Sequence, residues 1–383
     1  SFLLSSLRPI RVMQGQLRGE MRWLLLRKVL VVFQFSISVF MIIAMVFISR
    51  QLDFMRKTDL GFSPNKVAVV RMNNSIIRQQ QQSFKERLLQ GQYVESACLA
   101  SGHPGGYYDA TTVVIEGQEE TLRMRTLWTD EGLLNTMNIG LIKGRFFDKQ
   151  FPADSAHSVI LNETAVRQLG WTPDDALGKR IMIAQFDSTY KHIIGVVTDY
   201  HFTSLKERIE PLVVAYRPRG NNLLIKLGGS DLQQSVASLQ KVWDSFNTGF
   251  PMEFVFLDDT LNRMYARETI QGKMFSVFSV ISLAIGCLGI LGLASFMAEQ
   301  RRKEIGIRKV LGAGVSSIVT LISSDFLKLI VLATLIAIPV GLYFIQKWLQ
   351  EFAFRIDVQW WFFAGVGMMV LVVALITISA HAV

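Results

Sequence analysis

The chain has 383 residues, of which 50% are hydrophobic and only 19% are charged, and its formal net charge is +9. With a positive mean hydropathy as well, this composition excludes an ordinary soluble protein. The excess positive charge lies almost entirely on residues 1–28 and 298–319, next to long apolar segments. We therefore attribute the charge to membrane topology and expect no nucleic-acid partner.

Four apolar segments are long enough to cross about 30 Å of hydrocarbon at 1.5 Å per residue. They are residues 29–48, 274–297, 326–345 and 360–380. Residues 1–28, with six Lys or Arg and one acid, are expected to form a cytosolic linker and an interfacial helix before the first span.

The charge of the connecting segments orients these spans. Residues 298–319 carry five basic and two acidic residues, whereas residues 50–273 carry 26 and 25, and the loop 346–359 carries two of each. The positive-inside rule places residues 298–319 in the cytosol and residues 49–273 outside it. The sequence thus predicts a multi-pass cell (inner) membrane protein with a large periplasmic or extracytoplasmic domain, a short outer loop at 346–359 and membrane lipids as neighbours.

The large domain shows the pattern of an α+β fold. Strand–helix–strand patterns at residues 66–100 and 223–257 predict one subdomain split between the two ends, which strands at 112–115 and 122–128 would extend. An insertion of about 145–214 has its own short strands and predicts a smaller β-rich subdomain. The fold class is therefore an α-helical transmembrane region of four spans plus an extracytoplasmic α+β domain of two subdomains. Helical stalks are expected to extend the first span beyond its C-terminal end and the second span beyond its N-terminal end.

The sequence predicts no catalytic, cofactor-binding or metal-binding site. Ser101–Asp109 contains Ser, His and Asp, but all lie on one turn-rich loop, whereas a catalytic triad converges from separate elements. We expect a flexible loop there, with Tyr107 and Tyr108 as a contact surface. The five histidines lack metal-ligand spacing, and Cys98 and Cys287 are isolated. With no phosphate-binding glycine-lysine motif, the chain is not expected to be an ATPase itself.

A short basic segment between the second and third spans is the most distinctive feature. It is too charged to lie in lipid. It also has an apolar stripe, a pair of opposite charges at positions i and i+4, and two glycines at its end. A simple juxtamembrane anchor needs none of these features. Both an anchor and a docking helix fit the composition alone. The candidate docking residues are Arg302, Lys303, Glu304, Ile305, Gly306, Ile307, Arg308, Lys309, Leu311 and Gly312.

Three glycines in the second span, Gly286, Gly289 and Gly292, recur every third residue. Small residues allow membrane helices to approach closely. They predict a helix-packing seam, either within this chain or with a further set of membrane helices.

Residues 303–313 closely resemble the cytosolic signature of the MacB/FtsX-type family of ABC-transporter permeases. Residues 60–62, 161–165, 177–181 and 195–202 resemble the same family, in the same order. The opening residues 4–9 are similar to the link between repeated halves of eight-span members, and the chain starts at Ser1 without a Met. The resemblance therefore implies the second, C-terminal half of an eight-span permease.

The resemblance also implies a function. A separate cytosolic ABC ATPase would dock on the helix at 298–319 and hold ATP and Mg, with no cofactor on this chain. Its closure would move the extracytoplasmic domain (mechanotransmission) for efflux, lipoprotein release or related export. Further partners would be the other permease half or a second copy, and a periplasmic or outer-membrane protein. The alternative is a membrane-tethered binding or sensory protein without ATPase coupling.

Overall fold

The computed structural model describes residues 16–382 except 107, 120, 185–188, 230, 301–306, 308–309 and 311–314. The chain divides into two compact units. We call Ser1–Arg56 with Arg267–Val383 the membrane unit, and Lys57–Ala266 the inter-span domain.

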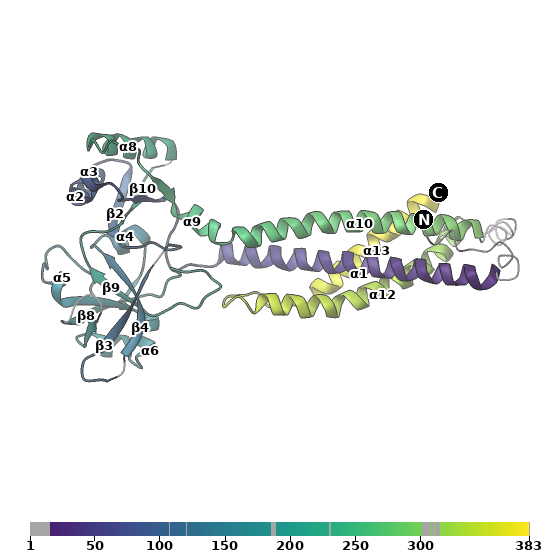
Figure 1. Ribbon diagram of the computed structural model, residues 1–383, viewed down its shortest axis with the longest axis horizontal. Coiled ribbons are helices and arrows are strands. Elements are labelled where there is room, and N and C mark those ends of the chain that lie inside the picture. Colours follow the sequence, from purple (N-terminus) through teal and green to yellow (C-terminus); the bar gives the residue numbers. More distant parts are fainter. Residues whose placement is uncertain are drawn as a thin grey trace, which may run out of the picture. The chain divides into compact units, whose positions relative to one another are not determined.

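The membrane unit is built from four long helices (Figure 1). They are α1 (Gln16–Lys57), α10 (Ala266–Gln300), α12 (Val315–Leu349) and α13 (Trp360–Ala382). Each contains a stretch long and apolar enough to cross a membrane, at Leu25–Lys57, Ala266–Met297, Ser324–Leu349 and Trp360–Ser379. Four long apolar helices are thus present where the spans were predicted, and the apolar stretch of α1 is the most buried of the four.

The inter-span domain contains two groups of strands in one hydrogen-bonded network. The first group is β1 (Val67–Arg71), β2 (Val94–Ala100), β10 (Asn222–Leu227) and β11 (Phe254–Phe256). Its order is β11-β1-β10-β2, and all its pairings are antiparallel. Its helices are α2 (Ser75–Gln79), α3 (Gln81–Leu89) and α8 (Leu232–Ser245). Phe84 of α3 and Trp243 of α8 pack edge to face over this group, so α3 and α8 share the core of the predicted split subdomain.

The second group closes on itself. Its strands are β3 (Asp109–Ile115), β4 (Thr121–Thr129), β5 (Leu141–Gly144), β6 (Ser158–Asn162), β7 (Arg180–Ile183), β8 (Tyr190–Val197) and β9 (Leu212–Tyr216). Pairings run β4-β3-β7-β8-β6-β9, and β9 then pairs with β4, while β5 attaches to β8. This circuit of six strands leaves its members without a free edge, as closure does in small barrels. Short helices accompany it: α4 (Leu133–Met137), α5 (Asp154–His157), α6 (Glu163–Gln168) and α7 (Pro173–Ala176).

The position of β3 and β4 differs from the sequence-based expectation. Both were expected to extend the split subdomain, yet β4 pairs with β3 on one edge and with β9 on the other. Only one residue pair, Ala100 with Thr129, joins β4 to β2 of the first group. The closed circuit therefore begins near residue 109, earlier than the expected insertion, because its hydrogen bonds are made with strands far along the chain.

The helical stalks are also only partly as expected. α1 continues without interruption to Lys57, as predicted. On the return, α9 (Leu257–Met264) ends before Tyr265, whose backbone leaves the helical region at φ −107° and ψ 16°, and α10 begins at Ala266. The second connection therefore contains a break where a continuous helix was expected.

Candidate functional site

Most of the predicted docking residues between 302 and 312 lie outside the described residues. Ile307 is described, and its side chain is 63% exposed; Val310, one turn further on, is 89% exposed. Two large apolar side chains at positions i and i+3 therefore face away from the described part of the chain. Such a pair is what a docking face would present to a partner.

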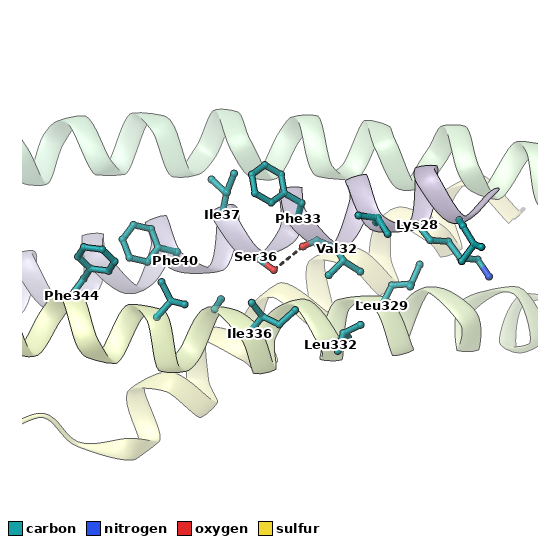
Figure 2. A pocket seen from close by; sticks show the side chains of 14 residues that line it. Lys28, Val32, Phe33, Ser36, Ile37, Phe40, Leu329, Leu332, Ile336 and Phe344 are labelled. Carbon is teal, nitrogen blue, oxygen red and sulfur yellow. Dashed lines mark hydrogen bonds between the residues drawn. The ribbon is translucent and has the colours of Figure 1, made fainter. Parts of the chain in front are cut away.

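A groove with a volume of about 890 Å³ lies between α1 and α12 in the membrane unit. Figure 2 shows Phe33 and Phe40 of α1 and Leu332 and Phe344 of α12 along it, with Lys28 at one end. Apart from Lys28 and Ser36 the lining is hydrocarbon, so the groove can accommodate apolar chains, and Lys28 is the one ionisable side chain in its lining.

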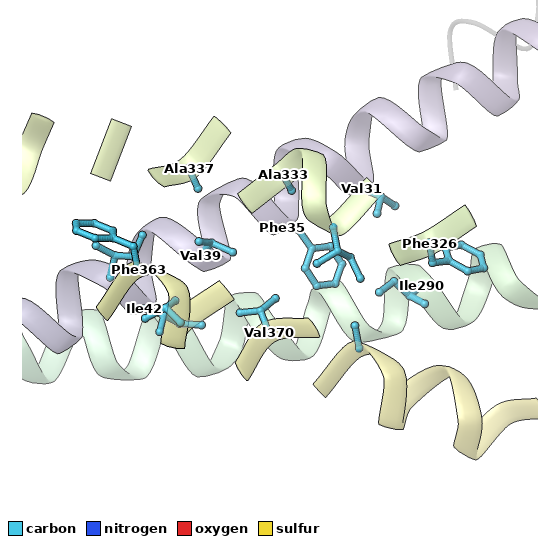
Figure 3. Packing of buried hydrophobic residues seen from close by; sticks show 14 of the residues in the cluster. Val31, Phe35, Val39, Ile42, Ile290, Phe326, Ala333, Ala337, Phe363 and Val370 are labelled. Carbon is cyan, nitrogen blue, oxygen red and sulfur yellow. The ribbon is translucent and has the colours of Figure 1, made fainter. Parts of the chain in front are cut away.

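The core of the membrane unit forms around α1. Phe35 and Val39 of α1 are almost completely buried, and Figure 3 shows them among Ile290 of α10, Ala333 of α12 and Val370 of α13. Because one helix contributes to contacts with the other three, the four helices share a single packed core.

Two serine side chains reinforce this packing with hydrogen bonds between helices. The hydroxyls of Ser38 on α1 and Ser282 on α10 lie 2.7 Å apart. The hydroxyl of Ser36 on α1 donates to the Ala333 carbonyl on α12 at 3.2 Å, and also to its own helix at Val32. Such bonds between membrane helices contribute about 0.6 kcal/mol on average. They fix the rotation of α1 relative to α10 and α12.

The predicted glycine seam separates into two parts. A Cβ on Gly286 would lie 3.0 Å from the ring of Phe35, so this glycine favours close packing of α10 on α1. A Cβ on Gly289 would meet only the Gln34 side chain at 3.9 Å, and one on Gly292 would meet no described atom within 4 Å. Gly286 therefore serves packing within the chain, while Gly292 faces open space and is free for a contact with another chain.

Gln51 is a site residue that the sequence analysis missed. It is fully buried near the end of α1. Its amide nitrogen donates to the Phe354 carbonyl at 2.9 Å, and its amide oxygen accepts from the Ile356 N–H at 3.0 Å. This pair of bonds fastens the outer loop between α12 and α13 to α1. The sequence does carry a signal for this residue. Phe47 and Met55 lie four residues before and after Gln51, so all three share one face of the helix, and both neighbours are also buried.

A buried ion cluster joins the two strand groups of the inter-span domain. The Lys85 ammonium on α3 lies 2.7 Å from Asp130 and 2.9 Å from Glu131, directly after β4, and the Lys85 and Asp130 side chains are at most 2% exposed. Asp130 also accepts from the N–H groups of Leu99 and Gly132. Burial alone would lower the pKa of Lys85, but the two carboxylates outweigh it and the pKa of Lys85 is raised. The cluster is therefore a charged clamp across the single-pair junction of β2 and β4.

The segment with Ser, His and Asp is structural. The Ser101 hydroxyl accepts from the Trp128 N–H at 3.0 Å, and Asp109 belongs to β3. Burial lowers the pKa of His103, whose ring nitrogen lies 3.0 Å from the Pro104 carbonyl oxygen. The three groups do not form a triad.

The expected contact surface on this loop is wrong for Tyr108, because Tyr108 is 4% exposed and stacks on Phe202 at 4.8 Å. Tyr107 lies outside the described residues. Within the described part of the chain, no group of three or more His, Cys, Asp or Glu residues could hold a metal ion. Cys98 and Cys287 are both free thiols.

Comparisons with known families account for most of the chain. The MacB-like periplasmic core domain family matches residues 29–242, and the FtsX-like permease C-terminal family matches residues 276–381.

Curated relatives include export proteins. The chain is 21% identical over 227 residues to the macrolide export ATP-binding/permease protein MacB of Sodalis glossinidius, covering 54% of this chain and 34% of that protein. It is 24% identical over 229 residues to the probable syringafactin export ATP-binding/permease protein SyfD of Pseudomonas syringae pv. tomato, covering 55% of this chain and 34% of that protein. The chain thus spans about a third of the length of the curated relatives it matches.

Two solved structures with similarity are domains from outside the cytosol. The periplasmic region of MacB from Actinobacillus actinomycetemcomitans is 15% identical, with a TM-score of 0.39, covering 54% of this chain and 95% of that one. The extracellular domain of the noncanonic ABC-type transporter YknZ from Gram-positive bacteria is 13% identical, with a TM-score of 0.36, covering 49% of this chain and 97% of that one.

Proposed function

Because the chain belongs to the MacB/FtsX-like permease family, matched over residues 29–242 and 276–381, we propose that it couples ATP hydrolysis on a partner to movement of its inter-span domain. The chain is the permease of a MacB/FtsX-type ABC transporter, with its inter-span domain in the periplasm. Permeases of this type work with an ABC ATPase. The partner ATPase would hold ATP and Mg, and would dock on the segment 298–319.

The observation that carries the proposal is the construction of α1. This helix runs unbroken from Gln16 to Lys57, and Ser36, Ser38 and Gln51 bond it to α12, α10 and the outer loop. A helix transmits displacement along its axis, whereas a glycine-rich linker absorbs it. A force applied at the cytosolic end of the membrane unit would therefore move its four helices as one body.

The break at Tyr265 supplies the complementary element. Its hydroxyl accepts from the Leu205 N–H at 2.9 Å, so the end of α9 is held within the inter-span domain. The change of backbone conformation between α9 and α10 makes this residue the natural hinge of the second connection. One rigid and one hinged connection would convert displacement into rotation of the domain.

For the work performed, we propose export, because the two named relatives are proteins of macrolide export and of probable syringafactin export. Efflux, lipoprotein release or related export would each fit this scheme. The alternative, a tethered binding or sensory protein, would need the inter-span domain but would not need the segment 300–311.

Hydrogen exchange separates the two functions. We expect ATP with vanadate to change the exchange of amides around Tyr265 in the native complex reconstituted in nanodiscs. Scrambling residues 300–311 should abolish that change without reducing membrane insertion. If amide exchange around Tyr265 does not change with ATP in the intact complex, or changes equally after scrambling, coupling would be contradicted and the tethered binder supported.

A further inference from the structure

A polar pocket of about 610 Å³ lies in the inter-span domain where its two strand groups meet. Ser101 and Trp128 lie on its wall, directly next to Ala100 and Thr129, the single residue pair that joins β2 to β4. The volume is within the range of sites that bind small molecules, about 300–1,000 Å³. The pocket is separate from the membrane helices and from the docking segment.

The charge of this pocket has one sign. Arg78, Arg217 and Arg219 line it, and its lining residues include no Asp or Glu. Among the salt bridges of the described residues, none involves these three arginines. By contrast, Arg125 and Arg145 elsewhere in the same domain are paired with carboxylates. A cleft lined by one sign of charge concentrates counter-ions.

The backbone next to Arg217 and Arg219 is held in place by contacts at Gly220. Gln81 is 4% exposed, and its amide donates to the Gly220 carbonyl at 2.7 Å and accepts from the Gly220 N–H at 3.1 Å. A Cβ on Gly220 would lie 2.4 Å from the Ala100 carbonyl oxygen, so only glycine lets the loop after β9 approach β2 this closely. Arg219 directly precedes this fastened glycine, and Arg217 lies three residues before it.

Side-chain contacts also hold two of the guanidinium groups. Arg217 lies over the ring of Trp128, 4.2 Å from its centre, and Arg78 donates to the Asn221 amide oxygen at 2.9 Å. That bond uses one of the five N–H donors of a guanidinium. Guanidinium groups bind carboxylates and phosphates through paired N–H donors, and held groups lose less entropy on binding.

An ordinary explanation is three solvated arginines on a surface. It accounts for the exposed charge, but it does not account for the buried glutamine and the obligatory glycine that hold the loop bearing two of these arginines, or for the aromatic ring packed against Arg217. We propose that this pocket is a binding site for a small polyanion bearing carboxylate or phosphate groups. An occupant would bridge the two strand groups next to the single residue pair that joins β2 to β4. The inference does not depend on ATPase coupling.

Calorimetric titration tests the site on the full chain in uncharged detergent at low salt. The probes are pyrophosphate for the phosphate source and citrate for the carboxylate source. We expect at least one to bind more tightly than about 1 mM, and Arg217→Gln with Arg219→Gln to weaken it about tenfold, or about 1.4 kcal/mol. Arg123→Gln, which removes an exposed charge of β4 outside this pocket, should leave the affinity within about twofold.

The stronger probe identifies the ligand class, and equal binding of both identifies a general polyanion site. Arg78→Gln provides a second variant, on another element, if the double variant loses stability in a thermal melt. Absence of binding by both probes, or equal weakening by Arg123→Gln, would overturn the proposal.

Discussion

Replacing Lys85 by Met tests the charged clamp between the strand groups. The substitution keeps an unbranched apolar stem but leaves Asp130, which is fully buried, without its ammonium partner. Removing one member of a buried ion pair costs about 3–5 kcal/mol. For a domain of this size each kcal/mol lowers the melting temperature by about 2–4 °C, so we expect a decrease of about 6–20 °C. Near-ultraviolet circular dichroism of the full chain in nanodiscs measures it.

Lys149→Met is the matched control. Lys149 pairs with Glu131 at 3.5 Å, but its side chain is 52% exposed. Exposed pairs contribute about 0–1 kcal/mol, so its melting temperature should fall by less than about 4 °C. Adding Asp130→Asn to Lys85→Met should recover part of the lost melting temperature, because it removes the buried negative charge that no longer has a partner. Equal decreases for the two lysine variants would refute the reasoning.

Three further predictions concern single contacts. Gln51→Leu should accelerate hydrogen exchange of the Ile356 amide about tenfold or more, since that amide loses its acceptor; unchanged exchange would show that the bond does not hold the loop. Gly286→Leu should lower the melting temperature of the membrane unit, whereas Gly292→Leu should not; equal effects would argue against the division of the seam. Burial acts to raise the pKa of Asp154, but hydrogen bonds from an arginine and a serine outweigh it, so this pKa is lowered. Its stabilisation is therefore present above about pH 4 and lost as pH falls through the lowered pKa, and Asp154→Asn should flatten an acid-unfolding curve in that range.

Local patterns predicted the elements whose signals lie within a few residues. The strand at Val94–Ala100 and the four spans follow from runs of apolar residues. Asn162 is the N-cap of α6 and accepts from the Ala165 N–H at 3.0 Å, a role for which asparagine is locally favoured.

Partners distant in sequence were not predictable in this way. β4 reads locally as a strand of either group, because only its pairing with β9 decides the group. The break at Tyr265 was missed because the apolar period of the stalk continues through it, and the period does not report the backbone angles of one residue.

The same limit applies to the sites. The basic segment and the glycines are contiguous or regularly spaced, so the sequence alone could propose them as sites. The arginine pocket brings together α2, β4 and the loop after β9, and Gln51 acts on residues of the loop 346–359. Neither arrangement has a local spacing to detect, since tertiary folding alone makes the groups neighbours.

Affinity purification of the native protein from its own membranes, in mild detergent, tests the central claim most directly. The account predicts that an ABC ATPase co-purifies with the wild-type protein and is lost with Arg308→Glu, while both forms remain inserted in the membrane. An ATPase that stays bound to the Arg308→Glu variant, or none bound to the folded wild-type protein, would contradict it.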